Sequence, residues 1–346
     1  MYLKMNKIII KTSIAAGIVL AALTVSGCAK SEKTLPNDAE QRYLEAWMKV
    51  KHPEASQTEL GTYMLEDIPG TGDAYHNQNY VIVDCTVKDL DGTISSTTSS
   101  KIAQQIGTYD KSYYYGASVW MAMNNSLPVG VEDMLDGMKV GGTRTSVIPA
   151  WLITYDRYKK PTEYLKHSTD NSTSIYTVTL RGISDDIYES QIDSIEAYAN
   201  KYLDGADSTD YGYYYKELKA PTDTNAFPSD TTIYINYIGR LLNGQVFDTT
   251  IKDTAKVHNI YSSSKTYSPV KIEWGDSFTD IKMYSDDSSE GSSVITGFSK
   301  TLWKMRHYGK SAGLFVSAYG YGSSGNGNSI LGYAPLMFEI EIVDKP

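Results

Sequence analysis

Two stretches with the same alternation of apolar and polar positions predict two similar β-hairpins. The first is VIVDCTVKDLDG at 81–92, and the second is IYINYIGRLLNG at 233–244, offset by 152 residues. Alternating apolar positions are typical of strands with one buried face, and the Asp-Gly or Asn-Gly pair that ends each stretch favours a tight turn. The apolar positions are Val81, Val83 and Cys85 in the first copy and Ile233, Ile235 and Tyr237 in the second. The chain therefore contains a tandem repeat.

A short helix and a closing strand follow in each copy. VEDMLDGMKVGG begins at 131 and FSKTLWKMRHYGK at 298, with apolar residues spaced by four and then three and a Gly after each segment. That spacing places one apolar face on a helix. The matched residues are Val131, Leu135 and Met138 against Phe298, Leu302 and Met305. Alternating strands are predicted at 174–183 and 336–343.

A longer amphipathic helix is predicted in front of each copy. The first begins at a cap-like Asn37 or Asp38, and the second begins at Ser184 or Asp185. The second helix is expected to present one face consisting of Ile192, Ile195, Tyr198 and Tyr202.

The repeat predicts an α+β protein with two related domains, each a mostly antiparallel sheet with one short helix across it. A single large domain is the alternative interpretation. The expected segments are a signal peptide at 1–27, a tether and helix at 28–58, a first domain at 59–184, a connecting helix at 185–209 and a second domain at 210–346.

The first residues have the pattern of an export signal. Lys4, Lys7 and Lys11 precede the apolar run TSIAAGIVLAALTV, which ends in VSGC at Cys28. This resembles a bacterial lipoprotein signal, in which Cys28 becomes the lipidated first residue; the alternative is an ordinary secretory signal with an incidental Cys. The following Ala29-Lys30 favours an outer-membrane anchor, again by resemblance, and the few acidic residues after Cys28 favour the periplasmic face.

Charge and cysteine content narrow the function classes. The formal net charge is −9, and removing the three Lys of the signal leaves −12. Nucleic-acid binding needs a basic surface, so the sequence argues against it. After Cys28 the chain has only Cys85, which cannot form an intrachain disulfide and is expected as a buried apolar residue on a strand, with a reactive thiol as the alternative.

The order of motifs in the second copy resembles the FKBP-type peptidyl-prolyl isomerases. A strand with an Asn-Gly turn is followed by VFDTT, a long variable segment, VITGFSKTLWKMRHYGK, AYGYG and APLMFEIEIV. The resemblance covers about 210–346 and, more faintly, 59–184. It implies a half-wrapped antiparallel sheet on one short helix, with a groove between them that binds a proline ring.

The resemblance also assigns a role to individual residues. Asp248 at the groove rim and the hydroxyl of Tyr321 are the implied catalytic residues. The implied substrate-binding residues are Tyr237, Phe247, Val294, Ile295, Phe298, Ile330 and Phe338. Alternatively, the aromatic residues only fill the core and Asp248 only stabilises a turn. No cofactor or metal is required, because peptide-bond rotation breaks no bond, and the five His residues have no metal-ligand spacing.

Departures from the family pattern leave three functions open. At the positions of Tyr237, Phe247 and Asp248 the first copy is expected to have Cys85, Ile94 and Ser95, so this domain is interpreted as lacking the active groove. Leu127-Pro128 and Val131 take the helix-entry and floor positions, and the segment 251–293 is interpreted as an insertion. The expected function is a cell-envelope isomerase and folding helper that acts on proline-containing polypeptides and is anchored to the membrane through Cys28. One alternative is a non-catalytic lipoprotein whose grooves bind extended peptide, and the other is a surface lipoprotein that binds a protein partner or glycan.

Overall fold

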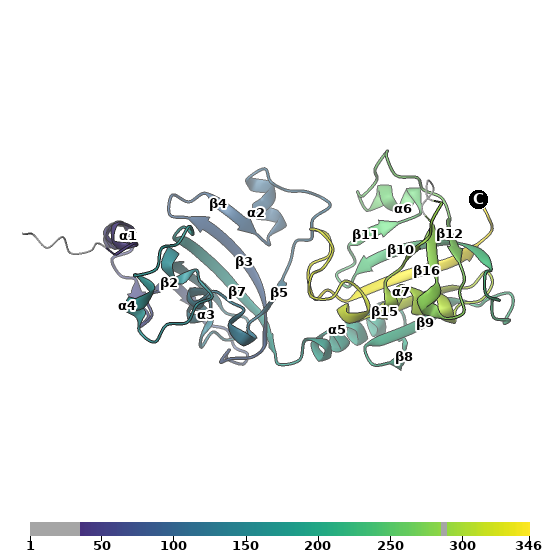
Figure 1. Ribbon diagram of the computed structural model, residues 1–346, viewed down its shortest axis with the longest axis horizontal. Helices are drawn as coiled ribbons and strands as arrows, with labels where there is room; N and C mark the ends of the chain where they lie inside the picture. The colour runs from purple at the N-terminus through teal and green to yellow at the C-terminus, as the bar shows by residue number, and fades with distance from the viewer. Residues whose placement is uncertain (1–34, 285–288) are drawn as a thin grey trace, which may run out of the picture. The chain divides into compact units, whose positions relative to one another are not determined.

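The computed structural model describes residues 35–284 and 289–346 (Figure 1). The predicted signal peptide and Cys28 lie outside the described residues. None of the described helices combines the length and the apolar character needed to cross a membrane.

The first domain contains an antiparallel sheet whose strands follow the order β1-β2-β6-β7-β3-β4 (Figure 1). A further strand, β5, pairs with the first half of β3, whereas β4 pairs with its second half. The strands are β1 (Ser56–Gln57), β2 (Tyr63–Ile68), β3 (Tyr80–Asp89), β4 (Ile94–Thr97), β5 (Ser118–Met121), β6 (Thr143–Ile148) and β7 (Ser174–Ser184).

The helices of the first domain are short, apart from the one that precedes it. They are α1 (Asp38–Lys51), α2 (Ser100–Gln105), η1 (Met123–Asn125), α3 (Val129–Leu135), η2 (Ala150–Leu152) and α4 (Pro161–Tyr164). Helix α3 packs its apolar side, including Val131 and Leu135, into a core that also contains Val83 and Val178 from the sheet. Cys85 is 8% exposed in this core, which confirms the prediction of a buried residue.

The second domain repeats the arrangement with additional strands at one edge. Its sheet order is β14-β13-β12-β10-β16-β15-β9-β8, and β11 pairs with β10. The strands are β8 (Asp207–Asp210), β9 (Tyr213–Lys219), β10 (Thr232–Leu241), β11 (Val246–Thr249), β12 (Val270–Glu273), β13 (Lys282–Tyr284), β14 (Ser292–Ser293), β15 (Lys310–Phe315) and β16 (Leu336–Val343). The predicted α+β class with two antiparallel sheets is confirmed.

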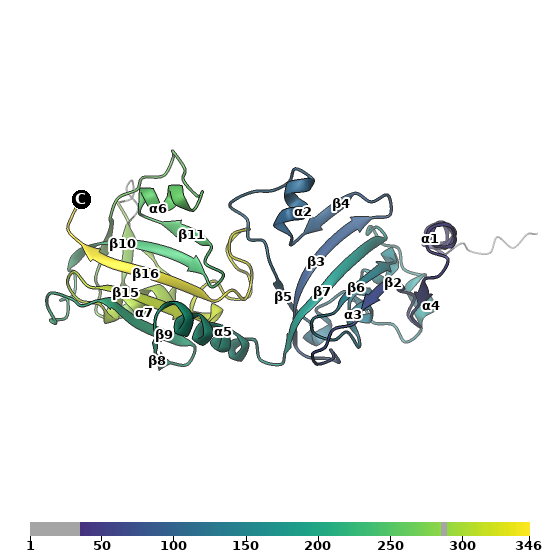
Figure 2. The same cartoon turned by 180° about the vertical axis from the view of Figure 1, so that it is seen from behind.

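Two helices cover the two faces of the second sheet (Figure 2). On the inner face α7 packs Phe298 and Leu302 into the main core, and on the outer face α5 covers Leu314 and Met337 with Ile195. The helices are α5 (Ile187–Tyr202), α6 (Lys252–Val257), η3 (Phe278–Asp280), α7 (Thr296–Lys304) and η4 (Ser317–Tyr319).

The helix starts differ from the sequence prediction in two respects. Asp186, not Ser184 or Asp185, caps α5, and its carboxylate accepts the N–H of Tyr188 at 2.8 Å. Asn37 stands at the start of α1, but its amide donates to the His167 carbonyl at 2.7 Å and does not cap the helix. The predicted apolar face of α5 was also wrong at one position. Its buried residues are Ile187, Gln191, Ile195 and Ala199, whereas Tyr202 is 59% exposed.

The offset of 152 residues holds without a gap from β3 through β5. Tyr80 pairs with Met121 in the first domain, and Thr232 pairs with Glu273 in the second, in the same antiparallel register. Helices α2 and α6 also correspond at this offset. The segment 251–293 is therefore not an insertion as a whole, because 252–273 has a full counterpart at 100–121.

The true insertion lies within 274–293. The offset between matching residues of the two domains is 152 at β5 and β12 but 167 at α3 and α7. The second domain therefore has 15 more residues between its strand and its helix. These residues supply η3, β13 and β14, and β13 pairs with β12 through Ile272 and Met283. The insertion thus extends the sheet beyond the edge at which the first sheet ends.

A close helix–strand approach is also repeated. A Cβ at Gly297 would lie 2.4 Å from the ring of Phe315, and a Cβ at Gly130 would lie 2.4 Å from Cγ2 of Ile148. Both pairs correspond at offset 167, so each domain uses a Gly in its helix to admit a large side chain from the adjacent strand. This contact fixes the height of each helix above its sheet.

Candidate functional site

A groove with a cavity volume of about 460 Å³ lies between α7 and the inner face of the second sheet. All nine residues predicted for the site in this domain line it: Tyr237, Phe247, Asp248, Val294, Ile295, Phe298, Tyr321, Ile330 and Phe338. Four further lining residues were missed from the sequence: Met283, Ser293, Asn326 and Ser329. Two of the four belong to the insertion, which had no recognisable counterpart, and two belong to the loop after Tyr321.

Aromatic rings form the floor and back of the groove. Phe298 and Phe338 are 2% and 5% exposed, and their rings meet edge to face with centroids 5.1 Å apart. Tyr237 stands edge-on to Phe298 at 5.6 Å, and Phe247 stands edge-on to Phe338 at 5.5 Å. Edge-to-face packing is a favourable aromatic geometry, so the rings hold one another in place. The same rings serve the core and the groove, so the two interpretations offered by the sequence are compatible.

Gly239 makes room for the ring of Phe247. A Cβ at Gly239 would lie 2.5 Å from Cε2 of Phe247 and 3.0 Å from Phe338. The register between β10 and β11 shifts beside this Gly, and Phe247 occupies the irregular position. A β-bulge re-aims a side chain, which here places Phe247 against the sheet as one wall of the groove.

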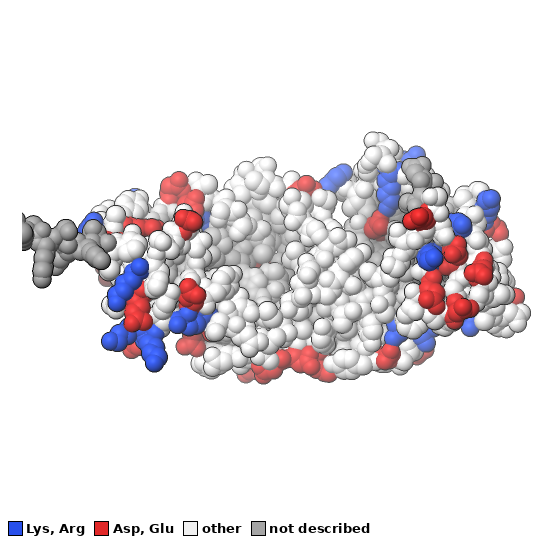
Figure 3. Space-filling view, viewed as in Figure 1, with Lys and Arg blue, Asp and Glu red and all other residues white. Residues whose placement is uncertain are grey.

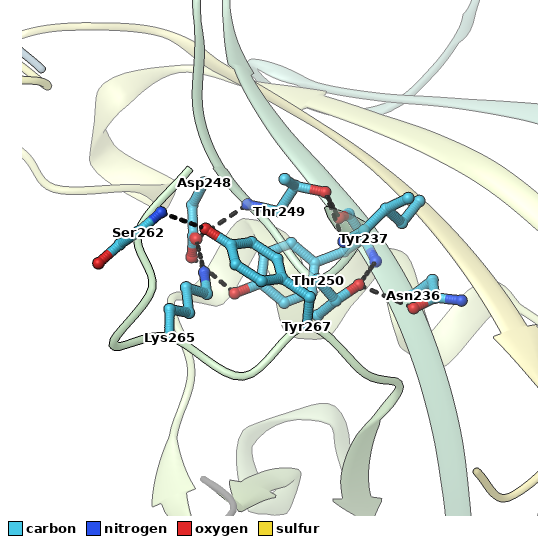
Figure 4. A network of polar contacts seen from close by, with 9 residues as sticks. Asn236, Tyr237, Asp248, Thr249, Thr250, Ser262, Lys265 and Tyr267 are labelled. Carbon is cyan, nitrogen blue, oxygen red and sulfur yellow. Dashed lines mark hydrogen bonds and ion pairs between the residues drawn. The ribbon is translucent and has the colours of Figure 1, made fainter. Parts of the chain in front are cut away.

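Asp248 is held at the rim by three neighbours (Figure 4). The hydroxyl of Tyr237 donates to Oδ2 at 2.6 Å, and the backbone N–H of Thr249 donates to Oδ1 at 2.8 Å. The ammonium of Lys265 forms an ion pair with Oδ1. A carboxylate with three donors is oriented, and with its side chain 39% exposed it still meets solvent.

The backbone on both sides of Tyr237 is fixed by two threonines. Thr250 Oγ1 accepts the Tyr237 N–H at 3.0 Å, and the Thr249 hydroxyl donates to the Tyr237 carbonyl at 2.8 Å (Figure 4). Burial raises the pKa of Tyr237 above its usual value, and the negative charge and hydrogen bond of Asp248 raise it further. Tyr237 is therefore a neutral donor throughout the physiological pH range.

Lys265 was not predicted as a site residue, and it supplies the cation that pairs with Asp248. It lies in a loop where Tyr261 and Tyr267 stack with centroids 5.4 Å apart, and the Tyr267 hydroxyl accepts the N–H of Ser262 at 3.0 Å. The first domain has the same stacked pair and the same hydrogen bond, 152 residues earlier. Its stacked pair is Tyr109 and Tyr115 at 5.2 Å, and the Tyr115 hydroxyl accepts the Asp110 N–H at 3.0 Å. This repeated Tyr-x5-Tyr spacing was the sequence signal that could have located the loop.

Two potential donors remain available to a bound molecule. Within the described part of the chain, neither the Tyr321 hydroxyl nor the N–H of Ile295 has a hydrogen-bond partner. Ile295 stands at the start of α7, directly after Val294, and Ile330 is buried beside them. The groove thus combines an apolar floor with donors at its rim.

The first domain also has a groove at the equivalent place, and whether it is active stays a prediction. Its cavity volume is about 350 Å³. It is lined by Trp120, Met121, Ser126, Leu127, Pro128, Val131, Tyr155 and Tyr176. Leu127, Pro128, Val131 and Tyr176 correspond to Val294, Ile295, Phe298 and Phe338. None of the lining residues carries a charge.

The predicted counterparts of Phe247 and Asp248 were displaced by one residue. Val87 pairs with Ser96 as Gly239 pairs with Asp248, so the counterparts are Ser95 and Ser96, not Ile94 and Ser95. The bulge lies at the same place in both hairpins, which the sequence did not reveal. With Cys85 at the Tyr237 position, the hydroxyl–carboxylate pair is absent from the first groove.

Asp248 is the one charged residue among those that line the two grooves. On the face shown in Figure 3, Lys and Arg lie in small groups beside Asp and Glu. Among residues 35–284 and 289–346, no cluster of three or more His, Cys, Asp or Glu could hold a metal ion. The second groove offers a defined shape, an apolar floor and the hydrogen bonds described above.

Comparison with known proteins identifies one family. The family model described as FKBP-type peptidyl-prolyl cis-trans isomerase matches residues 224–343. None of the curated proteins matches the chain significantly.

Solved structures similar to this chain include two bacterial proteins and one plant protein. A peptidyl-prolyl cis-trans isomerase from Pseudomonas syringae pv. tomato is 21% identical with a TM-score of 0.31, covering 46% of this chain and 92% of that chain. FkpA from Escherichia coli is 19% identical with a TM-score of 0.31, covering 45% and 57%. The three FKBP domains of wheat FKBP73 are 14% identical with a TM-score of 0.29, covering 84% and 98%.

Proposed function

Residues 224–343 belong to the FKBP-type peptidyl-prolyl cis-trans isomerase family, and we propose that the second groove of this chain catalyses rotation about X–Pro bonds. The observation that carries this proposal is that all nine residues expected from the family line one cavity. Its ring-lined floor is apolar, and its polar groups lie at the rim. A proline ring has an apolar surface that matches such a floor.

The groove stabilises the twisted amide in preference to the planar one. Resonance makes rotation cost roughly 18–20 kcal/mol in solution. In the twisted form that resonance is lost, and a largely apolar groove of fixed shape favours it over the hydrated planar form. Each ~1.4 kcal/mol of preferential binding gives about tenfold in rate.

The rim residues hold the peptide on each side of the rotating bond. The N–H of Ile295 and the hydroxyl of Tyr321 donate to substrate carbonyls, because neither is engaged within the described chain. Asp248 orients the Tyr237 hydroxyl at 2.6 Å and places a negative charge near the carbonyl that rotates. Lys265 keeps that carboxylate at the rim.

The test is cis–trans exchange of a short X–Pro peptide, measured by NMR with the full chain purified in mild detergent. Asp248→Ala combined with Tyr321→Phe is expected to reduce the accelerated exchange by at least about tenfold, since each change removes a rim contact worth about 1 kcal/mol or more. Exposed Tyr43→Ala on α1 is the matched control.

The outcomes separate an enzyme from a binding protein. Acceleration by the wild type that the double variant loses supports the proposal. Absence of acceleration by a folded chain contradicts it. Peptide binding without acceleration would favour the alternative, a non-catalytic protein that holds extended peptide.

We also propose that the chain is a lipid-anchored folding helper of the bacterial cell envelope, with Cys28 as the lipidated residue. This proposal is supported by the basic start, the apolar run and VSGC, all in the sequence. Labelling cells with a radioactive fatty acid is expected to mark the wild-type chain but not Cys28→Ser. A membrane fraction that contains both forms equally would contradict the anchor.

A further inference from the structure

The edge strands next to the two grooves differ in whether a further strand covers them. In the second domain β12 lies between β10 and β13, and β13 belongs to the 15-residue insertion. In the first domain the equivalent strand β5 pairs with β3 alone among the described residues. The edge that β13 occupies in the second domain therefore has no strand on it in the first.

The hydrogen-bonding groups on that edge of β5 can be assigned. The N–H of Ala122 donates to the carbonyl of Asn79, so Ala122 faces β3. Antiparallel strands alternate in this respect, so Trp120 also faces β3 while Val119 and Met121 direct their N–H and C=O groups outward. The hydrogen-bonding groups alternate in the same way in the second domain, because the N–H of Trp274, which matches Ala122, donates to the carbonyl of Thr231.

The second domain shows what such an edge accepts. Strand β13 pairs with β12 through Lys282 with Glu273 and Met283 with Ile272, and the side chain of Met283 lines the groove. The strand thus places one apolar side chain in the groove while its backbone extends the sheet. Its counterpart position in the first domain lies beside Trp120, which corresponds to Ile272 and lines the uncharged groove there.

We propose that the first domain binds an extended polypeptide by strand addition to the outer edge of β5, with one apolar side chain of that polypeptide entering the groove beside Trp120. The backbone groups of Val119 and Met121 supply the hydrogen bonds, and the groove of Trp120, Leu127 and Val131 selects an uncharged side chain. This binding is independent of turnover in the second domain.

The probe is a synthetic peptide with the sequence of residues 278–284, FTDIKMY, acetylated, amidated and labelled with fluorescein. Its binding to the full chain in mild detergent is followed by fluorescence anisotropy. In the register of β13, the amides of Lys282 and Tyr284 would bond to β5, and that of Met283 would point away. N-methylation at both Lys282 and Tyr284 is therefore expected to weaken binding by at least about tenfold, and N-methylation at Met283 by less than about threefold.

Variants of the chain locate the site. Trp120→Ala is expected to weaken binding at least about tenfold, since a buried aromatic contact contributes more than about 1.4 kcal/mol, whereas exposed Tyr43→Ala leaves it unchanged. The N-methyl series needs no variant, so it stands even if Trp120→Ala does not fold. The proposal would be overturned if the peptide methylated at both Lys282 and Tyr284 bound as well as the peptide methylated at Met283. Absence of binding to the intact chain would also overturn it, including the case in which the edge is occluded. Isomerase activity measured with and without excess probe shows separately whether the second groove takes part.

Discussion

The two domains have the same strand order and the same helix-to-strand contact, but their grooves carry different chemistry. Val87 and Ser95 in the first domain stand where Gly239 and Phe247 stand in the second. Because Gly239 has no Cβ, the ring of Phe247 can lie against the strand. In the first domain Val87 has a branched side chain at the matching position, and the residue at the Phe247 position is the small Ser95. The two domains thus differ at both positions of this pair, although they share the strand order around it.

The edges of the two sheets differ in a second way. The second domain covers the edge of β12 with its own β13, whereas the first domain ends at β5. An uncovered edge is a template for pairing with another chain, so it is normally protected unless it is used. The domain that lacks the hydroxyl–carboxylate pair is also the one in which β5 pairs with β3 alone among the described residues, so the proposed turnover and the proposed peptide binding fall in different domains.

The largest expected effect comes from the floor residues. Phe298→Ala removes a ring that is 2% exposed and contacts two other rings, so it should reduce the free energy of unfolding of the second domain by about 3–5 kcal/mol. Val131→Ala at the matching position removes only two methyl groups, at about 0.8 kcal/mol each before the cavity is counted. Urea unfolding with peptide-resolved hydrogen exchange assigns each loss to its domain. Equal losses would contradict the dual role of Phe298.

A double-mutant cycle sharpens the pairing of strand and ring. Gly239→Val places side-chain atoms where the ring of Phe247 lies and should destabilise the second domain by about 1–3 kcal/mol. Adding Phe247→Ser reproduces the first-domain pair Val87 and Ser95 and should recover part of that loss. Purely additive free energies of unfolding would show that the two positions are not coupled.

Alkaline pH should destabilise the first domain before the second through their matched core residues. Burial raises the pKa of Cys85 from 9.0 to about 12, whereas the ordinary value for its counterpart Tyr237 is 10.0. Between pH 9 and 12 the unfolded chain has lost the Cys85 proton and the folded chain has kept it, so stability present below pH 9 is lost at up to about 1.4 kcal/mol per pH unit. Urea titrations at pH 8, 9 and 10 measure this slope.

Cys85→Ala is the control for that slope. It should remove the part of the pH dependence that begins near pH 9 and leave the part due to tyrosines. The native thiol should also react slowly with alkylating reagents at pH 8, because burial disfavours the thiolate. An unchanged slope in the variant would assign the effect to other groups.

The smallest expected effects come from the repeated tyrosine loops. Tyr267→Phe and Tyr115→Phe each remove a hydroxyl that accepts a backbone N–H at 3.0 Å but keep the stacked ring. Each should cost about 0.5–1 kcal/mol, measured by the same unfolding experiment. Only Tyr267→Phe should also alter isomerase activity, because only that loop carries Lys265 to Asp248. Matching activity changes for both variants would argue against that role of the loop.

The sequence by itself determined the repeat, the fold class and nine of the thirteen residues that line the second groove. The strands and helices were predictable because the periodicity of apolar residues is visible in one sequence. This periodicity is the alternation in 81–92 and 233–244 and the helical spacing after 131 and 298. The site residues could be predicted because they stand at fixed positions within those strands and helices. The cap of α5 was displaced to Asp186, since several neighbouring residues could have served.

Tertiary structure decided what no local pattern contains. The bulges that set Ser96 against Val87 and Asp248 against Gly239 are features of strand pairing and are not displayed by the sequence. The predicted counterparts Ile94 and Ser95 were wrong for a different reason, because they departed by one residue from the constant offset of 152. Lys265 reaches Asp248 across 17 residues of chain because of how its loop folds back. Whether a further strand pairs with β5 is likewise decided by the sheet topology. Pairing between strands that are distant in sequence is visible only once the sheet is formed.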